Sequence, residues 1–475
     1  MNDDTQAAWI ENLTYDELAV GASARLLRTL TLADIQAFAA VSGDTNPAHL
    51  DADYANATLF HGIIAHGMWG ASLISALLGT EFPGPGTIYL AQALNFSRPV
   101  RVGDTLTVTA TVTTKDDAKK AVELMCVVDN QNGVRVLSGT ARVLAPTVKL
   151  RLPRQDLPRI QLFDPEARFR ALLKLAQGMP AARCAVVHPC DTETLASALD
   201  AAARGLIDPV LVGPSGRLRQ VADEAGLDLR DIPIVDTPHS HASADAAAAM
   251  ALNSQVEMLM KGSRRNGELL DAVQARSGLM SARRMSHIYR YDVPMYAKPL
   301  LITDAAFNFQ PTLEAKADIV RNAIDFAHLL GIDQPKVALL AAQETVASTL
   351  PSTLDAAALC AMARRGQIRG GTLDGPLGLD NAISAAAAQA KNVTSPVAGD
   401  PDVLVVPDLE SGAMLTKQLE HLSGATGSGL IVGARVPISL SGRADGPNAR
   451  IATLVLALLQ AHNARRDHPR QRWVP

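Results

Sequence analysis

A carboxylate and an imidazole lie five positions apart in the stretch SGDTNPAHLD, residues 42–51. Asn46 and Pro47 between them favour a bend, so the side chains of Asp44 and His49 could converge on one small molecule. A carboxylate and an imidazole that share one water molecule can take one proton and give another, which the addition of water across a double bond requires. The structural alternative is that Asp44 caps a turn and His49 is a core or surface histidine.

The next informative stretch, AHGMWGASLIS at residues 65–75, begins an apolar helix. Gly67 at its start would let a carbonyl oxygen approach backbone N–H groups, and the positive end of the helix dipole would add to that field. Such a site suits chemistry beside a thioester carbonyl, where enolate-like charge develops. Each of two neighbouring residues has two possible roles. His66 could close the site or belong to the core, and Ser75 could support the carboxylate or pack as a small residue.

The elements around these residues follow two different periods. Residues 32–41 and 66–79 have helical apolar patterns. Alternating stretches follow at 87–96, 104–114, 121–129 and 134–143, separated by turn residues. We therefore expect an α+β domain in which one long apolar helix lies across a curled antiparallel sheet.

These residues resemble the MaoC-like (R)-specific enoyl-CoA hydratases of the hot-dog fold. The similarity covers roughly residues 15–145 and rests on the D-x-N-P-x-H motif followed by H-G-M. It implies that Asp44 and His49 activate water for syn addition to an acyl-CoA thioester, and that the Gly67 amide polarises the thioester. It also implies that Ser75 supports the site, and it makes Asn46 and His66 candidates for substrate binding.

The second part of the chain has a different pattern of apolar and polar residues. Four prolines interrupt the pattern between residues 145 and 165, so we expect domains at 1–147 and 164–475, joined by a linker at 148–163. Continuous apolar runs such as CAVVH, DPVLVG, KVALLAA and DVLVVPD alternate with alanine-rich helical stretches. This alternation predicts a two-lobed α/β domain with mainly parallel sheets.

Charged residues follow several of these predicted strands. Asp374, Asp408, Arg435 and Arg443 lie in or beside glycine-rich segments where open α/β sheets bind ligands. Taken singly, each could equally be a helix cap or a salt-bridge partner.

Nearly all of residues 165–465 resembles the phosphate acetyl/butyryltransferase family, in stretches such as KPLLITDAAFN, DGPLGLDNAIS and GARVPISLSGRAD. The resemblance implies acyl transfer between coenzyme A and phosphate, with CoA thioesters and phosphate or acyl phosphate as substrates. It implies no metal and no tightly bound cofactor. Arg443 would hold the phosphate, a task that suits the forked guanidinium.

One position departs from the family pattern Ser-Arg-x-Asp. The chain reads SLSGRAD, so Gly442 occupies the serine position, and Ser441 lies one residue early. Both remain candidates for substrate binding. Two hypotheses follow: a bifunctional hydratase and acyltransferase, or a hydratase fused to a catalytically impaired module that senses acyl-CoA and drives oligomerisation.

The bulk composition excludes some functions. The 475 residues are 48% hydrophobic with a net charge of −4, which gives no reason to expect nucleic acid or an anionic membrane as a partner. No apolar run reaches the roughly 18 residues that span a bilayer, and four scattered cysteines suit a reducing cytoplasm. Because both resembled families dimerise, we expect a homo-oligomer larger than a dimer, for example a hexamer.

Overall fold

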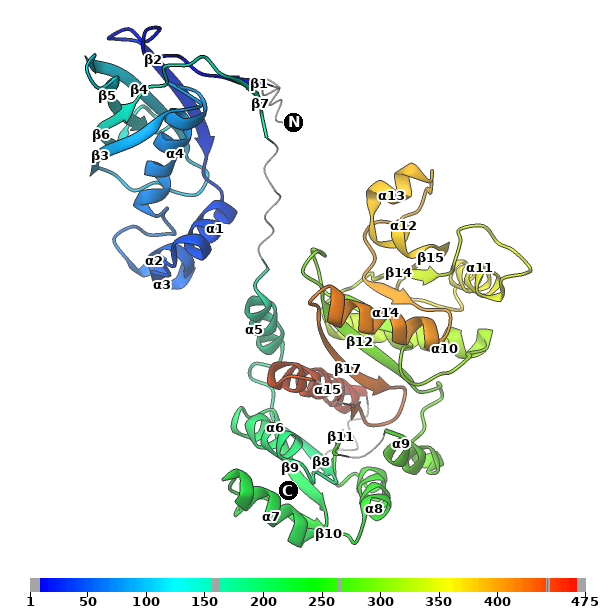
Figure 1. The fold of residues 1–475 in the computed structure, drawn as a ribbon. Helices are drawn as coiled ribbons and strands as arrows, with labels where there is room; N and C mark the ends of the chain where they lie inside the picture. The colour runs from blue at the N-terminus through cyan, green and yellow to red at the C-terminus, as the bar shows by residue number, and fades with distance from the viewer. Residues whose placement is uncertain (1–8, 156–162, 264–265, 441, 443–444, 468–475) are drawn as a thin grey trace. The chain divides into compact units, whose positions relative to one another are not determined.

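The computed structural model describes residues 9–155, 163–263, 266–440, 442 and 445–467 (Figure 1). Backbone packing divides the chain into two compact units, Met1–Leu162 and Phe163–Pro475. Each unit has its own hydrophobic core, and each is described separately below.

The first unit is built on a five-stranded antiparallel sheet. Its strands, in spatial order, are β2 (Ser23–Thr29), β4 (Thr105–Asp116), β5 (Ala121–Asp129), β6 (Arg135–Leu144) and β3 (Ile88–Phe96). Buried residues alternate with partly exposed ones along β4, as expected for a sheet with one face on a core.

Helix α4 (Gly67–Thr80) covers the inner face of this sheet (Figure 1). Its buried stripe includes Leu73, Ile74, Leu77 and Leu78, which join the strand residues in one core. The apolar spacing in the sequence produces this stripe because positions three and four apart share a helix face. The expected α+β hot-dog architecture is confirmed.

Short elements complete the first unit. Helices α1 (Leu32–Ser42), α2 (Pro47–Leu50) and α3 (Ala52–Ala57) precede α4. Strand β1 (Trp9–Glu11) pairs antiparallel with β7 (Arg151–Pro153), so part of the segment expected to be a linker is a strand.

The second unit contains one continuous sheet of eleven strands. In spatial order they are β10 (Ile234–Asp236), β9 (Ile207–Gly213), β8 (Ala182–Val187), β11 (Met258–Lys261), β18 (Ile438–Ser439), β17 (Thr426–Val432), β12 (Ser286–Asp292), β13 (Leu300–Thr303), β16 (Val403–Val405), β14 (Lys336–Leu340) and β15 (Thr372–Leu377).

Strand direction reverses in the middle of this sheet. Strands β10, β9, β8, β11 and β18 are parallel, and so are β13, β16, β14 and β15. Strands β17 and β12 join the two groups through three antiparallel pairings, so the groups run in opposite directions. The expected two-lobed, mainly parallel α/β domain is confirmed, and its lobes share one sheet.

Helices pack around this sheet (Figure 1). They are α5 (Pro165–Leu175), α6 (Thr192–Ala203), α7 (Ser215–Ala225), α8 (Ser240–Leu252), α9 (Asn266–Gln274), the 3₁₀ turn η1 (Ser277–Leu279), α10 (Leu313–Leu329), α11 (Pro351–Arg364), α12 (Leu379–Ile383), α13 (Ala385–Ala390), α14 (Leu409–Leu422) and α15 (Pro447–Asp467).

Helix α15 runs through the core of the second unit. Residues 454–458 are all buried, which places apolar side chains around the whole circumference of the helix. It contacts α5 and α6 on one side and α10 and β17 on the other. Among the described helices, none has both the length and the apolar composition that crossing a bilayer would require.

Candidate active sites

The turn after α1 presents Asp44. Helix α1 ends at Ser42 and is capped by Gly43, whose φ of +75° is the left-handed conformation that glycine adopts easily. The Gly43 N–H donates to the Ala39 carbonyl. The Asp44 N–H then donates to Ser42 Oγ (3.2 Å), and Asp44 Oδ1 accepts the Asn46 N–H (3.2 Å). Asp44 is exposed, so its carboxylate is held by the turn and remains open to a ligand.

His49 enters the site from the helix that follows. Asn46 caps α2 by accepting the Ala48 N–H at 3.1 Å, and Pro47 occupies the first helical position, where its missing N–H costs nothing. His49 is 9% exposed, and its Nδ1 lies 2.9 Å from the Ile64 carbonyl oxygen. Because a carbonyl can only accept, Nδ1 carries the proton, and Nε2 has the free lone pair of the neutral ring.

Asp44, His49 and His66 lie together. One carboxylate oxygen and one nitrogen from each ring are all within 4.8 Å of one another. A water that donates two hydrogen bonds of about 2.8 Å holds its acceptors roughly 4.5 Å apart, so this spacing fits one shared water. Two imidazoles and a carboxylate are also a ligand set that Zn²⁺ accepts.

A cavity of about 340 Å³ opens beside the two imidazoles. Its lining is mostly apolar, and it comprises His49, Phe60, Ile64, Ala65, His66, Gly67, Gly70, Phe96, Ser97, Arg98, Pro99, Val100, Val128, Val136 and Leu137. A mostly apolar pocket of this size with a few polar groups is typical of a small-molecule site.

Gly67 forms the part of the cavity wall where α4 begins. A Cβ at this position would lie 3.2 Å from the Phe96 ring, so glycine permits the close approach of that ring. The helix N-terminus has no side-chain cap, and the Trp69 N–H donates to the His66 carbonyl at 3.0 Å, which leaves the Gly67 and Met68 N–H groups for an external oxygen. An uncapped helix start in a cavity wall is suited to bind an oxyanion.

Ser75 does not line the cavity that His49 and Gly67 share. It lies on an exposed position of α4, two residues beyond the buried Leu73. Among the described residues, the hydrogen bonds of Asp44 are to Ser42, Asn46 and His66, not to Ser75. Its expected supporting role therefore stays a prediction.

In the second unit, a cavity of about 770 Å³ lies where β14 and β16 end and α11 and α14 begin. Asp408 lines it and caps α14 by accepting the Ser411 N–H at 2.8 Å. The wall also contains the buried Lys316, whose Nζ is 2.7 Å from Asp355 Oδ2. Sequence reasoning did not identify this ion pair, because helix residues with opposite charges are ordinarily surface partners.

The loop after β13 is organised by another buried carboxylate. Asp304 accepts hydrogen bonds from the N–H groups of Ala306 and Phe307 and from the Asn308 side chain. Burial raises the pKa of Asp304. Nearby in β12, burial lowers the pKa of His287 to about 3, so its ring is neutral near pH 7. These contacts are typical of a structural loop.

The other predicted residues of the second unit are dispersed. Arg435 lines a separate small cavity of about 60 Å³ with Glu257 and Arg465. Asp374 is half-buried in β15. Gly442 is exposed, and its N–H donates to Asp445 Oδ2 at 2.7 Å. Ser441 and Arg443 lie outside the described residues.

Strand direction explains part of this dispersion. Asp408 follows β16, and Gly442 follows β18, and these two strands run in opposite directions. The ends of these two strands therefore lie at opposite edges of the sheet, because strand ends share a ligand-binding edge only within one parallel group.

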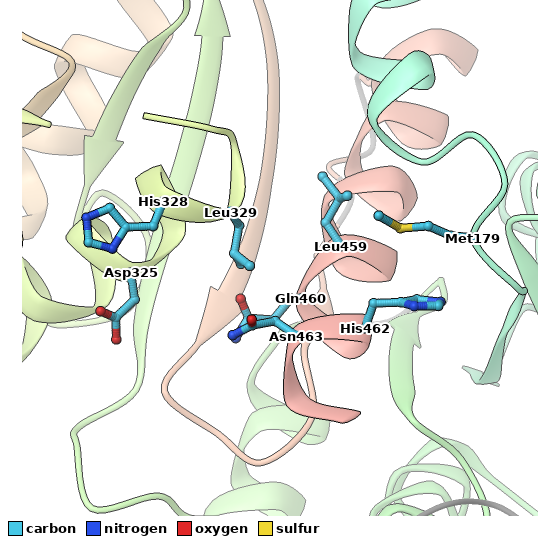
Figure 2. Close-up of a pocket in the computed structure, with 8 residues that line it drawn as sticks. All are labelled: Met179, Asp325, His328, Leu329, Leu459, Gln460, His462 and Asn463. Carbon is cyan, nitrogen blue, oxygen red and sulfur yellow. The ribbon is translucent and has the colours of Figure 1, made fainter. Parts of the chain in front are cut away.

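A further cavity, of about 560 Å³, lies between the ends of α10 and α15. Figure 2 shows Asp325 and His328 on one side and Gln460, His462 and Asn463 on the other. The ring nitrogens of His328 and His462 are each 2.8 Å from a main-chain carbonyl, so both rings have structural anchors. This cavity contains none of the residues expected to be functional.

Comparisons with known proteins decide the family. Residues 241–458 match the family described as phosphate acetyl/butaryl transferase. The phosphate acetyltransferase of Rhizobium meliloti is 49% identical over 300 residues, which is 63% of this chain and 95% of the relative. The chain belongs to the phosphate acetyl/butyryltransferase family. Phosphate butyryltransferase of Clostridium acetobutylicum is 35% identical over 62% of this chain and 98% of its own.

The chain is also similar to solved structures, and a second family description matches its first unit. The structure of a branched-chain phosphotransacylase from Enterococcus faecalis V583 matches 59% of the present chain and 99% of its own, at 28% identity and a TM-score of 0.52. Residues 19–132 match the MaoC like domain. The R-hydratase PhaJ1 from Pseudomonas aeruginosa is 46% identical over 33% of this chain and 99% of its own, with a TM-score of 0.32. Both resemblances found in the sequence are confirmed, and the chain is an enzyme.

Proposed function

We propose that the first unit hydrates trans-2-enoyl-CoA to (R)-3-hydroxyacyl-CoA, and that the second unit transfers an acyl group between coenzyme A and phosphate. The observation that carries the first proposal is the cluster of Asp44, His49 and His66, whose polar atoms lie within 4.8 Å of one another. The cavity beside it, with Gly67 in its wall, provides room for an acyl group.

The proposed reaction uses one bound water. Asp44 and His49 Nε2 hold that water against one face of the alkene. The water oxygen bonds to C3, the Asp44–His49 pair takes one proton from it, and the pair returns a proton to C2. Both new bonds form on the face where the two residues lie, so the addition is syn. The negative charge that develops on the thioester oxygen is stabilised by the N–H groups at the start of α4.

The direct test of the first proposal is an assay with crotonyl-CoA. Loss of the enoyl thioester absorbance measures hydration, and chiral separation of the product identifies the enantiomer. We expect the (R)-3-hydroxyacyl product. An inactive protein, or a product of (S) configuration, would refute the proposal.

Arg98 lines the same cavity and is exposed to solvent, so it is suited to bind an anionic part of coenzyme A. We expect Arg98→Gln to raise KM for crotonyl-CoA about threefold to tenfold, because charge-assisted hydrogen bonds to phosphate are lost, while kcat changes little. The matched control is Arg142→Gln. Arg142 is an exposed arginine of β6 that pairs with Asp116 of β4. Equal KM values for the two variants would contradict this assignment.

Family membership supports acyl transfer by the second unit. Its candidate sites are the cavity that Asp408 and Lys316 line and the segment that contains Gly442. An assay with acetyl phosphate and coenzyme A, followed by thioester absorbance, tests the proposal. The alternative is an acyl-CoA sensor without turnover, which the glycine in place of the family serine favours. Acetyl-CoA binding without thioester formation would support the sensor and refute acyl transfer.

Gly442→Ser separates these two functions. If the missing hydroxyl limits the reaction, we expect acyl transfer to increase about tenfold or more, since one hydrogen bond to a charged group is worth this much. The new Cβ would lie 2.8 Å from Asp445 Oδ1, so the Asp445 carboxylate must rotate to admit it. Gly446→Ser is the matched control, because a Cβ at that position meets open space. Unchanged acyl transfer in the Gly442 variant would show that the serine is dispensable.

We also propose a homo-oligomer larger than a dimer, for which a hexamer is one arrangement, working in a reducing cytoplasm. Strand β3 supports self-association of the first unit, since it pairs with β6 alone among the described strands and so is an edge of the sheet. It exposes several large apolar side chains: Ile88, Tyr89, Leu90 and Phe96. An apolar, unpaired edge of this kind is suited to pair with a second copy.

A further inference from the structure

We infer that His66 is a positioning residue of the hydration site, which fixes Asp44 through a main-chain hydrogen bond and His49 through ring contact. This inference rests on the proposed hydration. His66 is 2% exposed and lines the same cavity as His49. It contacts the main chain of Asp44 and the ring of His49, and its backbone immediately precedes the Gly67 amide.

The first contact fixes the turn that carries Asp44. His66 Nε2 is 3.0 Å from the main-chain carbonyl oxygen of Asp44. Because that carbonyl can only accept, the proton is on Nε2. Asp44 otherwise lies in an exposed turn, and this hydrogen bond ties the turn to the buried start of α4. Without it, the carboxylate could move away from the position that shares water with His49.

The second contact concerns the rings. The centroids of His66 and His49 are 3.9 Å apart, with 35° between their planes. On α1, the Phe38 ring is 5.1 Å from His66. The His66 side chain therefore packs against residues of α1 and α2 while it belongs to the start of α4. One residue connects the elements that present the carboxylate, the imidazole and the amide.

The position of His66 in the sequence would favour a different role. It is the N-cap residue of α4, where a side chain usually accepts a hydrogen bond from the second or third helical N–H. His239 does this for α8, since its Nδ1 accepts the Ala242 N–H at 3.2 Å. His66 makes no such bond, and its Nδ1 is buried without a partner among the described residues. The ring therefore bonds the Asp44 carbonyl in place of capping α4. A histidine with only a structural role at the helix start would be expected to cap the helix.

The test compares His66→Phe with His66→Gln. Phenylalanine keeps a ring beside His49 but has no donor for the Asp44 carbonyl, whereas the glutamine amide nitrogen can replace Nε2. We expect kcat for crotonyl-CoA to fall about tenfold to 100-fold in His66→Phe, with KM within about threefold of wild type, because misplacement of a catalytic group acts on the chemical step. His66→Gln should retain kcat within about threefold.

If thermal unfolding shows that His66→Phe is not folded, His66→Asn takes its place. The asparagine side chain is shorter than that of glutamine, so its amide does not reach the Asp44 carbonyl. His239→Phe is the control for a lost histidine cap, and it should leave hydration unchanged. Wild-type kcat in His66→Phe or His66→Asn would overturn the inference, and so would equal losses in these variants and His66→Gln. Absence of hydration in the wild-type protein would instead refute the proposed function.

Discussion

Replacement of Asp44 by asparagine lowers crotonyl-CoA hydration by at least about 100-fold, which is the usual scale for the loss of a general acid or base. Asparagine keeps an oxygen that can accept the Asn46 N–H, so the turn is retained. It cannot take a proton from water near pH 7. The effect therefore belongs in kcat, which initial rates over a range of crotonyl-CoA concentrations would measure.

Asp51→Asn is the matched control for this variant. Asp51 is a carboxylate in the same stretch, and it caps α3 by accepting the N–H groups of Asp53 and Tyr54. Asparagine caps helices about as well as aspartate, so hydration should remain near the wild-type rate. If Asp44→Asn stays within a few-fold of wild type, the role assigned to Asp44 is wrong.

The second large effect is expected at His49. His49→Ala should lower kcat for hydration at least about 100-fold, because the basic Nε2 atom is lost. His49→Asn is the more informative change, since its amide nitrogen can still donate to the Ile64 carbonyl in place of Nδ1. We expect His49→Asn to lose as much hydration activity as His49→Ala but to lose less stability. Enzyme kinetics and thermal unfolding measure the two effects.

A histidine outside the cluster is the control here. His61 is exposed and has a positive φ of 51°, a conformation that asparagine tolerates, so His61→Asn should keep activity. The double variant Asp44→Asn/His49→Asn should be little worse than either single variant, because residues that act on one water lose their effects together. Multiplied losses would argue against a shared water.

The proximity of Asp44 and His49 could be predicted from the sequence because the two residues are local. Asp44 and His49 are separated by one turn, and the turn residues themselves bring them together. Gly67 was predicted from its position at the start of an apolar helix, and it does line the cavity. The structural function of Asn46 as a helix cap was less apparent, since the same residue type serves turns, caps and ligands.

Contacts between distant segments were harder to predict. The link from His66 to the Asp44 carbonyl spans 22 positions and uses a main-chain atom, which has no sequence signature. In the second unit, the apolar runs CAVVH, DPVLVG, KVALLAA and DVLVVPD coincide with β8, β9, β14 and β16. Strand directions, however, depend on sheet order. The reversal through β17 and β12 separates the strand ends at Asp408 and Gly442, and apolar periodicity contains no information about it.

The central place of α15 has a consequence for biosynthesis. The second unit begins at Phe163, yet the helix that fills its core starts at Pro447, so 447 − 163 = 284 residues are made between them. At translation rates of about 5–20 residues per second, roughly 15–60 s pass before that core can close. The first unit ends at Leu162 and has its own hydrophobic core, so it can fold during this interval. Apolar strands of the nascent second unit stay uncovered meanwhile, which makes them natural clients of ribosome-associated chaperones.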